Sequence, residues 1–127
     1  MVKERERLER NPAFRPERKV PKPFRLMTRE EQAEAVRKNP DYGELVCRCQ
    51  QVSKAEILRA IHNPIGARTM ASVKYRSRAM MGRCQGGYCQ MRIARLLEEE
   101  AHLKDTELTY ERPGSWLFTG SVRGEER

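Results

Sequence analysis

The chain has 127 residues, of which 38% are hydrophobic, 35% are charged and 6% are aromatic, and its net charge is +8. This length fits one small domain with extensions rather than two cores, and the apolar content is too high for a wholly disordered chain. A basic chain can bind nucleic acid, but here the aromatic residues are not interleaved with basic ones as base-stacking platforms require. No nucleic-acid partner is therefore expected.

The first residues, MVKERERLER, are charged throughout and lack the apolar stretch of a secretory signal. The longest apolar runs are three residues, so no membrane span is expected and the protein is predicted to be cytoplasmic. Because the cytosol keeps thiols reduced, the four cysteines favour a metal site over disulfides.

Residues 1–39 are expected to form a Pro-rich basic arm with a short helix at its end, which together dock on a partner. Four prolines between positions 12 and 23 fix the backbone and remove donors, which predicts extended chain. The arm is interpreted either as a solvated tail or as a segment that wraps a partner. In the second case Phe14, Phe24 and Leu26 are the anchors.

Helix starts are marked by capping residues, in two cases followed three positions later by Glu as in a capping box. The segment ELVCRCQQV, which follows the first helix, has β-type residues and is expected to be extended. The four expected helices lie at about 29–38 after Thr28, after Ser53 until Asn63-Pro64, from Thr69 until Gly82, and over about 89–103.

The predicted fold is a small all-α domain of the helix-turn-helix kind at 40–104, following the arm. Residues 105–127 are expected to be a docking tail with two short β-type runs around Pro113-Gly114. The apolar run Trp116-Leu117-Phe118 in this polar tail indicates burial against another surface.

The four cysteines form a C-x-C pair, Cys47 and Cys49, and a C-x4-C pair, Cys84 and Cys89. Thiolates are soft ligands that select zinc, copper(I) or iron–sulfur clusters. A structural zinc ion usually takes pairs folded tightly onto it, whereas the thiolates of C-x-C on nearly extended chain diverge and suit a larger core. A [2Fe–2S] rhomb needs two thiolates for each iron, so the spacing favours this cluster over zinc, with uncoordinated or disulfide-linked cysteines third.

Two glycines lie between the cysteines of the second pair. Gly86 and Gly87 have no Cβ, so their backbone can adopt positive φ and direct N–H groups at bridging sulfides. Such hydrogen bonds adjust the reduction potential of a cluster. Cys89 is expected at the start of the last helix, where the helix dipole favours a thiolate.

The stretches VCRCQQVSKAEILRAI and KYRSRAMMGRCQGGYCQMRIARLL together resemble the bacterioferritin-associated ferredoxin-like (BFD-like) [2Fe–2S] domain over about 40–104. The closer likeness is to the version at the C-terminal end of FAD-dependent glycerol-3-phosphate dehydrogenases. The family often has Gly where this chain has Met80, so the local turn departs from the family pattern. The resemblance implies that the cluster ligands, on loops joining short helices, are Cys47, Cys49, Cys84 and Cys89.

Two arginines lie next to the expected ligands. Arg48 separates the first cysteine pair and Arg83 precedes the second. A positive charge roughly 8 Å from the cluster favours its extra electron by about 2 kcal/mol at an effective dielectric of about 20. These side chains either adjust the cluster potential in this way or are ordinary solvated residues.

Catalytic machinery is not expected. The Gly-Gly pair lies between ligands rather than after a strand, as a dinucleotide site requires, and His62 and His102 are interpreted as surface or cap residues. The predicted function is one-electron transfer as a subunit of a flavin-dependent dehydrogenase complex, with FAD or FMN on the partner. Its substrate would be glycerol 3-phosphate, proline or another amino acid or opine. The alternatives are a stand-alone ferredoxin that donates electrons to a partner such as bacterioferritin, and a structural zinc scaffold.

Overall fold

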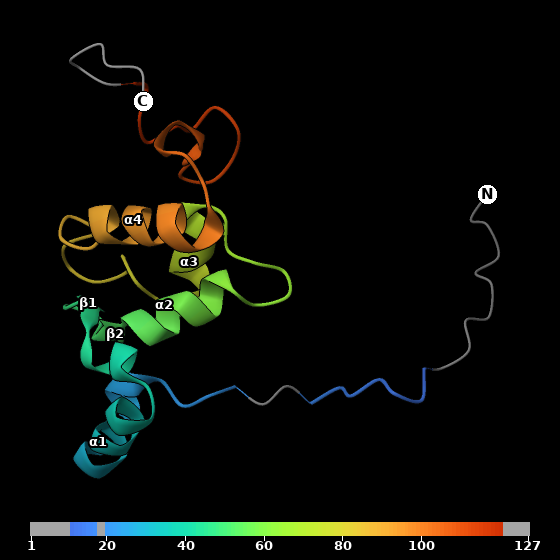
Figure 1. Ribbon diagram of the computed structural model, residues 1–127, viewed down its shortest axis with the longest axis vertical. Coiled ribbons are helices and arrows are strands. Elements are labelled where there is room, and N and C mark those ends of the chain that lie inside the picture. The colour runs from blue at the N-terminus through green and yellow to red at the C-terminus, as the bar shows by residue number, and fades with distance from the viewer. Residues whose placement is uncertain (1–10, 18–19, 121–127) are drawn as a thin grey trace.

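The computed structural model describes residues 11–17 and 20–120 (Figure 1). Helices dominate, and the sheet in the described part of the chain is one two-stranded hairpin, which confirms the predicted all-α class. None of the described helices is both long enough and apolar enough to cross a membrane. In chain order the elements are η1 (Phe24–Leu26), α1 (Arg29–Lys38), η2 (Pro40–Gly43), β1 (Leu45–Cys47), β2 (Val52–Ser53), α2 (Lys54–Ile61), α3 (Met70–Ser77), α4 (Gln90–Ala101) and η3 (Asp105–Glu107).

The start of α1 is a capping box, as predicted. The Thr28 hydroxyl accepts the Glu31 N–H at 3.3 Å, and the Glu31 carboxylate accepts the Thr28 N–H at 2.7 Å. Such caps contribute about 1 kcal/mol by satisfying N–H groups that the helix leaves free. None of the residues of α1 is fully buried, and the helix lies at the edge of the domain beside η2 (Figure 1).

The N-terminus of α2 is a second capping box, and this one is buried. The Glu56 carboxylate accepts hydrogen bonds from the N–H and the hydroxyl of Ser53, at 2.9 Å and 2.8 Å. Its other oxygen accepts the N–H of Phe24 at 3.1 Å. The ring of Phe24 is itself buried and stacks on Tyr42 with centroids 5.8 Å apart. The end of the arm is thereby fixed to the domain.

The core lies between α2, α3 and α4, which all contact one another. Full burial of an aliphatic side chain in such a core stabilises the fold by about 1.5–3 kcal/mol. The fully buried large side chains from these helices include Ile57, Ile61, Met70, Val73, Ile93 and Leu97.

The third helix is shorter than predicted, because it ends at Ser77 rather than at Gly82. The Ser77 hydroxyl donates to the Val73 carbonyl at 2.7 Å and accepts the Ala79 N–H at 3.2 Å, and Arg78 adopts a left-handed φ of 66°. A side chain that bonds to the backbone in this way competes with continuation of the helix. The residues from Arg78 to Cys89 therefore form turns, within which Met80 is also left-handed.

The segment after η3 packs on the domain itself. Leu108 is fully buried, and the N–H groups of Met70 and Ala71, at the start of α3, donate to the carbonyls of Thr109 and Tyr110 at 3.1 Å and 2.7 Å. One bridge joins Thr109 to Trp116 across the turn that contains Pro113-Gly114. Of the apolar run predicted to be buried, Leu117 and Phe118 pack against the core, while Trp116 is 51% exposed.

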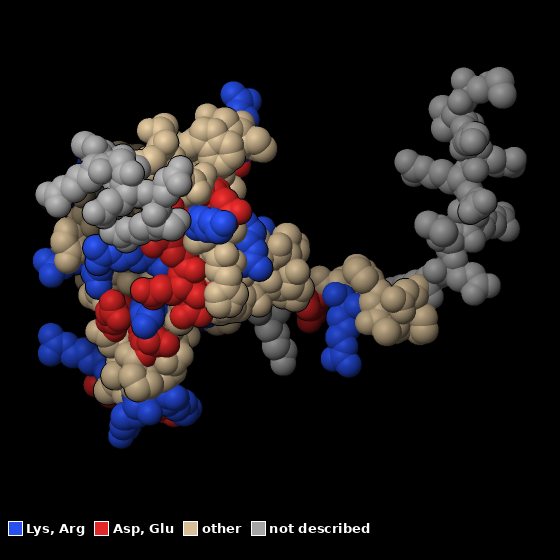
Figure 2. Space-filling view, turned by 45° about the horizontal axis from the view of Figure 1, so that its top comes forward, with Lys and Arg blue, Asp and Glu red and all other residues tan. Residues whose placement is uncertain are grey.

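Between residues 11 and 23, the described part of the arm runs away from the domain and lacks helix and strand (Figure 1). It contains one turn, in which the Phe14 N–H donates to the Asn11 carbonyl at 3.0 Å. Of its expected anchors, Phe14 and Leu26 are exposed and only Phe24 is buried. On the domain, charges of both signs occur on the face seen in Figure 2, where the acidic side chains gather in a central group. The positive net charge is thus unevenly distributed over the surface.

Candidate metal centre

The four cysteines come from three adjoining pieces of backbone. Cys47 ends β1, Cys84 lies in the turns before α4, and Cys89 caps the N-terminus of α4. Cys49 lies in the hairpin turn rather than on extended chain as predicted, because Cys47 pairs with Val52 and the chain must reverse between them.

Cys49 lies between two other cysteine sulfurs and so connects the first cysteine pair with the second. The Cys47 and Cys49 sulfurs are 3.8 Å apart, and those of Cys49 and Cys84 are 3.5 Å apart. Cys47 and Cys89 are fully buried, whereas Cys49 and Cys84 are exposed. In the described part of the chain, no three His, Cys, Asp or Glu side chains converge as the ligands of one metal ion. The donor set, two pairs of soft thiols from separate loops, has the composition that a [2Fe–2S] cluster requires.

Burial and backbone amides set the thiol pKa values in different directions. Burial, together with the nearby Cys47, raises the pKa of Cys89 to about 12. Loss of solvent disfavours the charged form of a thiol that binds no metal. The Cys84 thiol raises the pKa of Cys49, whereas the backbone N–H groups of Tyr88 and Gly86 lower the pKa of Cys84. Cys84 is therefore the thiol of this pair that deprotonates first.

The two predicted glycines have different roles. Gly86 has a φ of 96°, as expected, and a Cβ there would lie 3.4 Å from Cγ of Met80. Gly87 does not adopt positive φ, and its N–H donates to the Cys84 carbonyl at 2.9 Å instead of facing the sulfurs. The amide that acts on Cys84 in its place belongs to Tyr88, which the sequence did not single out.

Gly82 is a site residue that was predicted only as a helix stop. A Cβ at this position would overlap the Cys49 sulfur and lie 2.9 Å from the Cys49 Cβ. The loop that carries Cys84 can therefore approach the hairpin turn only if residue 82 has no side chain. The sequence signal was its place two residues before Cys84, but its partner, Cys49, lies far away along the chain.

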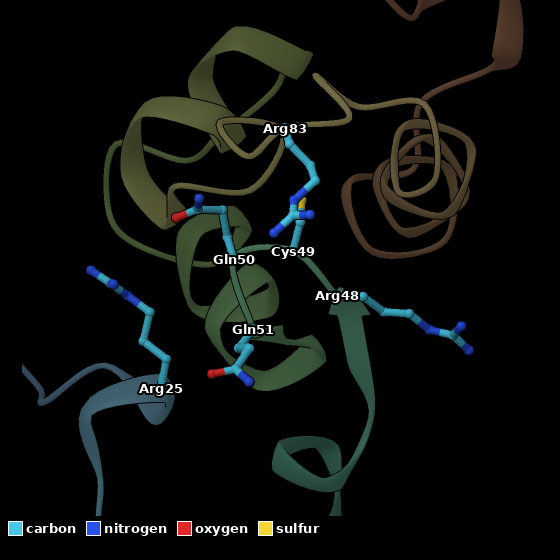
Figure 3. Close-up of a pocket in the computed structure, with 6 residues that line it drawn as sticks. All are labelled: Arg25, Arg48, Cys49, Gln50, Gln51 and Arg83. Atoms are coloured by element: carbon cyan, nitrogen blue, oxygen red, sulfur yellow. The ribbon is translucent and has the colours of Figure 1, made fainter.

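An open hollow of about 500 Å³ adjoins Cys49 (Figure 3). Both predicted arginines line it, and Figure 3 shows that the side chain of Arg48 points away from Cys49. The Arg48 guanidinium lies 4.7 Å from the centre of the Tyr88 ring. The remaining lining residues were not predicted and are Arg25, Gln50 and Gln51.

Arg92 joins the two ligand-bearing segments. Its guanidinium donates to the Leu45 carbonyl at 2.9 Å and to the Glu44 carboxylate at 2.8 Å, which ties the first turn of α4 to β1. The histidines lie away from this centre, as predicted: His62 ends α2 and contacts Glu100 at 2.8 Å, and His102 ends α4.

Comparison with known proteins gives two kinds of match. Residues 45–99 match the model of the BFD-like [2Fe–2S] binding domain. A glycerol 3-phosphate dehydrogenase of Caloramator mitchellensis is 38% identical over 119 residues, which are 94% of this chain but 25% of that protein. No solved structure matches the chain significantly.

Two further relatives match shorter stretches. Hydrogen cyanide synthase subunit HcnB of Pseudomonas aeruginosa is 44% identical over 55 residues, 40% of this chain and 11% of that protein. Anaerobic glycerol-3-phosphate dehydrogenase subunit A1 of Haloferax volcanii is 37% identical over 68 residues, 54% of this chain and 11% of that protein. The chain thus spans a quarter or less of the length of these relatives.

The matched segment contains the hairpin, the turns before α4, the three core helices and all four cysteines. The resemblance noted in the sequence is thereby confirmed for this part of the chain. Residues 45–99 belong to the family of BFD-like [2Fe–2S] binding domains.

Proposed function

We propose that the chain holds a [2Fe–2S] cluster through Cys47, Cys49, Cys84 and Cys89 and serves as an electron-transfer component of a flavin-dependent dehydrogenase. The observation that carries this proposal is the meeting of both thiol pairs within a segment of BFD-like type, with neighbouring sulfurs 3.5 Å and 3.8 Å apart.

When bound, such a cluster supplies a one-electron couple. The protein's own residues then have distinct tasks. The buried Cys47 and Cys89 keep water from the inner side of the site, and the amides of Gly86 and Tyr88 stabilise negative charge on the Cys84 sulfur. Arg83, which lines the same hollow as Cys49, adds a positive charge that favours the reduced state.

The relatives support a dehydrogenase context. The match to the Caloramator glycerol 3-phosphate dehydrogenase extends over nearly the whole chain, beyond the BFD-like segment. We therefore favour glycerol 3-phosphate as the substrate of the complex over proline or another amino acid or opine. The flavin, FAD or FMN, would belong to the partner, and this chain would pass single electrons from reduced flavin to another carrier.

Metal and sulfide analysis of anaerobically purified protein tests the cluster. We expect two irons and two acid-labile sulfides per chain, and a red-brown colour that bleaches on reduction. Zinc without labile sulfide would contradict the proposal and favour the structural scaffold. The Cys84→Ser variant should lose the visible spectrum, while Arg112→Gln, which changes an exposed residue of the C-terminal segment, should retain it.

Copurification tests the dehydrogenase assignment separately. A tagged chain expressed in its source cells should bring down a protein with bound flavin that reduces the cluster when glycerol 3-phosphate is added. A cluster-loaded chain recovered without any flavoprotein would contradict this part of the proposal and leave the cluster itself standing.

A further inference from the structure

The expected ligands differ in their access to solvent. Cys47 and Cys89 are fully buried, whereas Cys49 and Cys84 are exposed and only 3.5 Å apart. Electron transfer between proteins weakens steeply with distance, so a partner gains most by approaching the least covered side of the site. The edge formed by Cys49 and Cys84 is that side.

The surface beside this edge is basic and unneutralised. Arg25, Arg48 and Arg83 line the hollow next to Cys49, and within the described ranges none of them has a carboxylate at ion-pair distance. Nearby, Lys54 and Arg92 are paired with Asp41 and Glu44. Three guanidinium groups without an ion pair in the described residues therefore border the hollow beside Cys49.

Arg25 reaches the hollow from a different part of the chain. It lies on η1, whose neighbouring residue Phe24 is buried and donates its N–H to Glu56. Figure 3 shows Arg25 and Arg48 extending on opposite sides of the turn that carries Cys49. Two of the three guanidinium groups are thus directed outward from the site.

An exposed aromatic residue adjoins the same edge. Tyr88 is 44% exposed, with Arg48 and Arg92 within 4.7 Å and 5.8 Å of its ring centre. Tyr and Arg are the side chains most enriched among residues that dominate the energy of protein interfaces. This composition suits contact with another protein.

We propose that the hollow flanked by Arg25 and Arg48 is the surface on which a partner with an acidic face docks, exchanging electrons across the Cys49–Cys84 edge. This inference rests on the proposed function. In each encounter one electron leaves the reduced cluster and one oxidised one-electron carrier on the partner accepts it.

Small redox reagents of opposite charge test the surface without a protein partner. Stopped-flow oxidation of the dithionite-reduced, cluster-loaded chain is measured with ferricyanide, which becomes ferrocyanide, and with hexaammineruthenium(III), a cation. Arg25→Gln and Arg48→Gln should each slow the ferricyanide reaction by about threefold at 10 mM salt, where electrostatic steering is strong. The ruthenium reaction should not slow.

Arg112→Gln is the matched control, because Arg112 is exposed in the C-terminal segment and does not line the hollow. It should leave the ferricyanide rate within experimental error of the unchanged protein. If both hollow variants behave like this control, or slow the two reagents equally, the proposed docking surface is wrong.

A binding measurement gives a readout without electron transfer. Hexacyanochromate(III) has the charge of ferricyanide and accepts no electron from the cluster, so its affinity is measured by calorimetric titration. The double variant Arg25→Gln/Arg48→Gln should bind it about tenfold more weakly at low salt and equally in high salt. Unchanged affinity at low salt would overturn the proposal.

The two proposals fail separately. If hollow variants slow ferricyanide but no flavoprotein copurifies with the chain, the docking surface stands and the dehydrogenase assignment fails. If a flavoprotein does bind, with an affinity that neither salt nor the two arginine variants change, the dehydrogenase assignment stands and the docking surface fails.

Discussion

Gly82 lies where the sulfur of Cys49 leaves no room for a side chain. The Gly82→Ala variant must therefore separate the ligand loop from the hairpin turn, and overpacking of this kind costs about 1–3 kcal/mol. We expect several-fold less iron per chain after reconstitution, measured by visible absorbance and iron analysis, with helix content by circular dichroism retained.

Gly43→Ala is the control for this prediction. A Cβ at Gly43 would make an ordinary contact, 3.4 Å from the Val36 side chain, and lies away from the cysteines. This variant should load with iron normally. Equal iron content in the two variants would show that the close approach at Gly82 is not needed.

Met80 presents a second conflict between backbone and side chain. It is 2% exposed and has a φ of 63°, in the left-handed region that disfavours every residue except Gly by about 1 kcal/mol or more. Met80→Ala should destabilise the domain by about 2–5 kcal/mol through the cavity. Met80→Gly should be about 1 kcal/mol more stable than Met80→Ala, because it also releases the backbone strain.

The order of stability of Met80→Gly and Met80→Ala is measured as the apparent melting temperatures of the cluster-loaded variants under anaerobic conditions. Ala94 in the buried face of α4 provides the comparison, since Ala94→Gly should be destabilising by about 1 kcal/mol, as is usual inside a helix. A Gly variant at position 80 that melts below the Ala variant would contradict the prediction.

At the scale of elements, the N-terminus of α2 joins the arm, the hairpin and the core through one carboxylate. Glu56→Ala removes the acceptor for the N–H groups of Ser53 and Phe24, which are buried. Leaving buried donors without a partner costs about 1–3 kcal/mol. We expect a loss of stability of that size and faster hydrogen exchange at the Phe24 amide.

The capping box of α1 is the matched comparison, because Glu31 is exposed. Glu31→Ala should cost no more than about 1 kcal/mol, since water can replace the lost acceptor. Equal stability of Glu56→Ala and Glu31→Ala would show that the buried hydrogen bonds of Glu56 do not contribute more to stability than an exposed cap does.

The contrast between these elements also shows what sequence patterns can predict. The starts of α1, α2 and α3 were predicted because Thr28, Ser53 and Thr69 act on residues within the same turn. The early end of α3 was not, because Ser77 fits a helical pattern, and the sequence does not show that its hydroxyl bonds to the backbone or that Arg78 and Met80 adopt positive φ.

The same distinction holds at the candidate site. The spacing of the cysteines predicted that the two pairs meet, and the Cys49 and Cys84 sulfurs do lie 3.5 Å apart. Arg48 and Arg83, which adjoin cysteines in sequence, line the hollow beside Cys49. Gly82 and Arg25 were missed because each matters only through a neighbour distant along the chain. The ligand set itself stays a prediction.

At the scale of the whole molecule, the C-terminal segment is part of the folded body. Carbonyl groups of Thr109 and Tyr110 accept hydrogen bonds from the first N–H groups of α3, and Leu108 is fully buried. A chain ending at residue 104 should therefore melt well below a chain ending at residue 120, even in the absence of any partner. A segment that serves only for docking would leave the melting temperature unchanged and reduce only partner binding.

The unequal exposure of the cysteines also decides which thiols should be oxidised when protein without a cluster is kept in air. Once iron has been lost, Cys49 and Cys84 are the thiols that oxygen reaches first, and their sulfurs are already 3.5 Å apart. Oxidation should join this outer pair in a disulfide while Cys47 and Cys89 stay reduced. Apoprotein stored in air would then bind no new iron until a reductant has cleaved this disulfide.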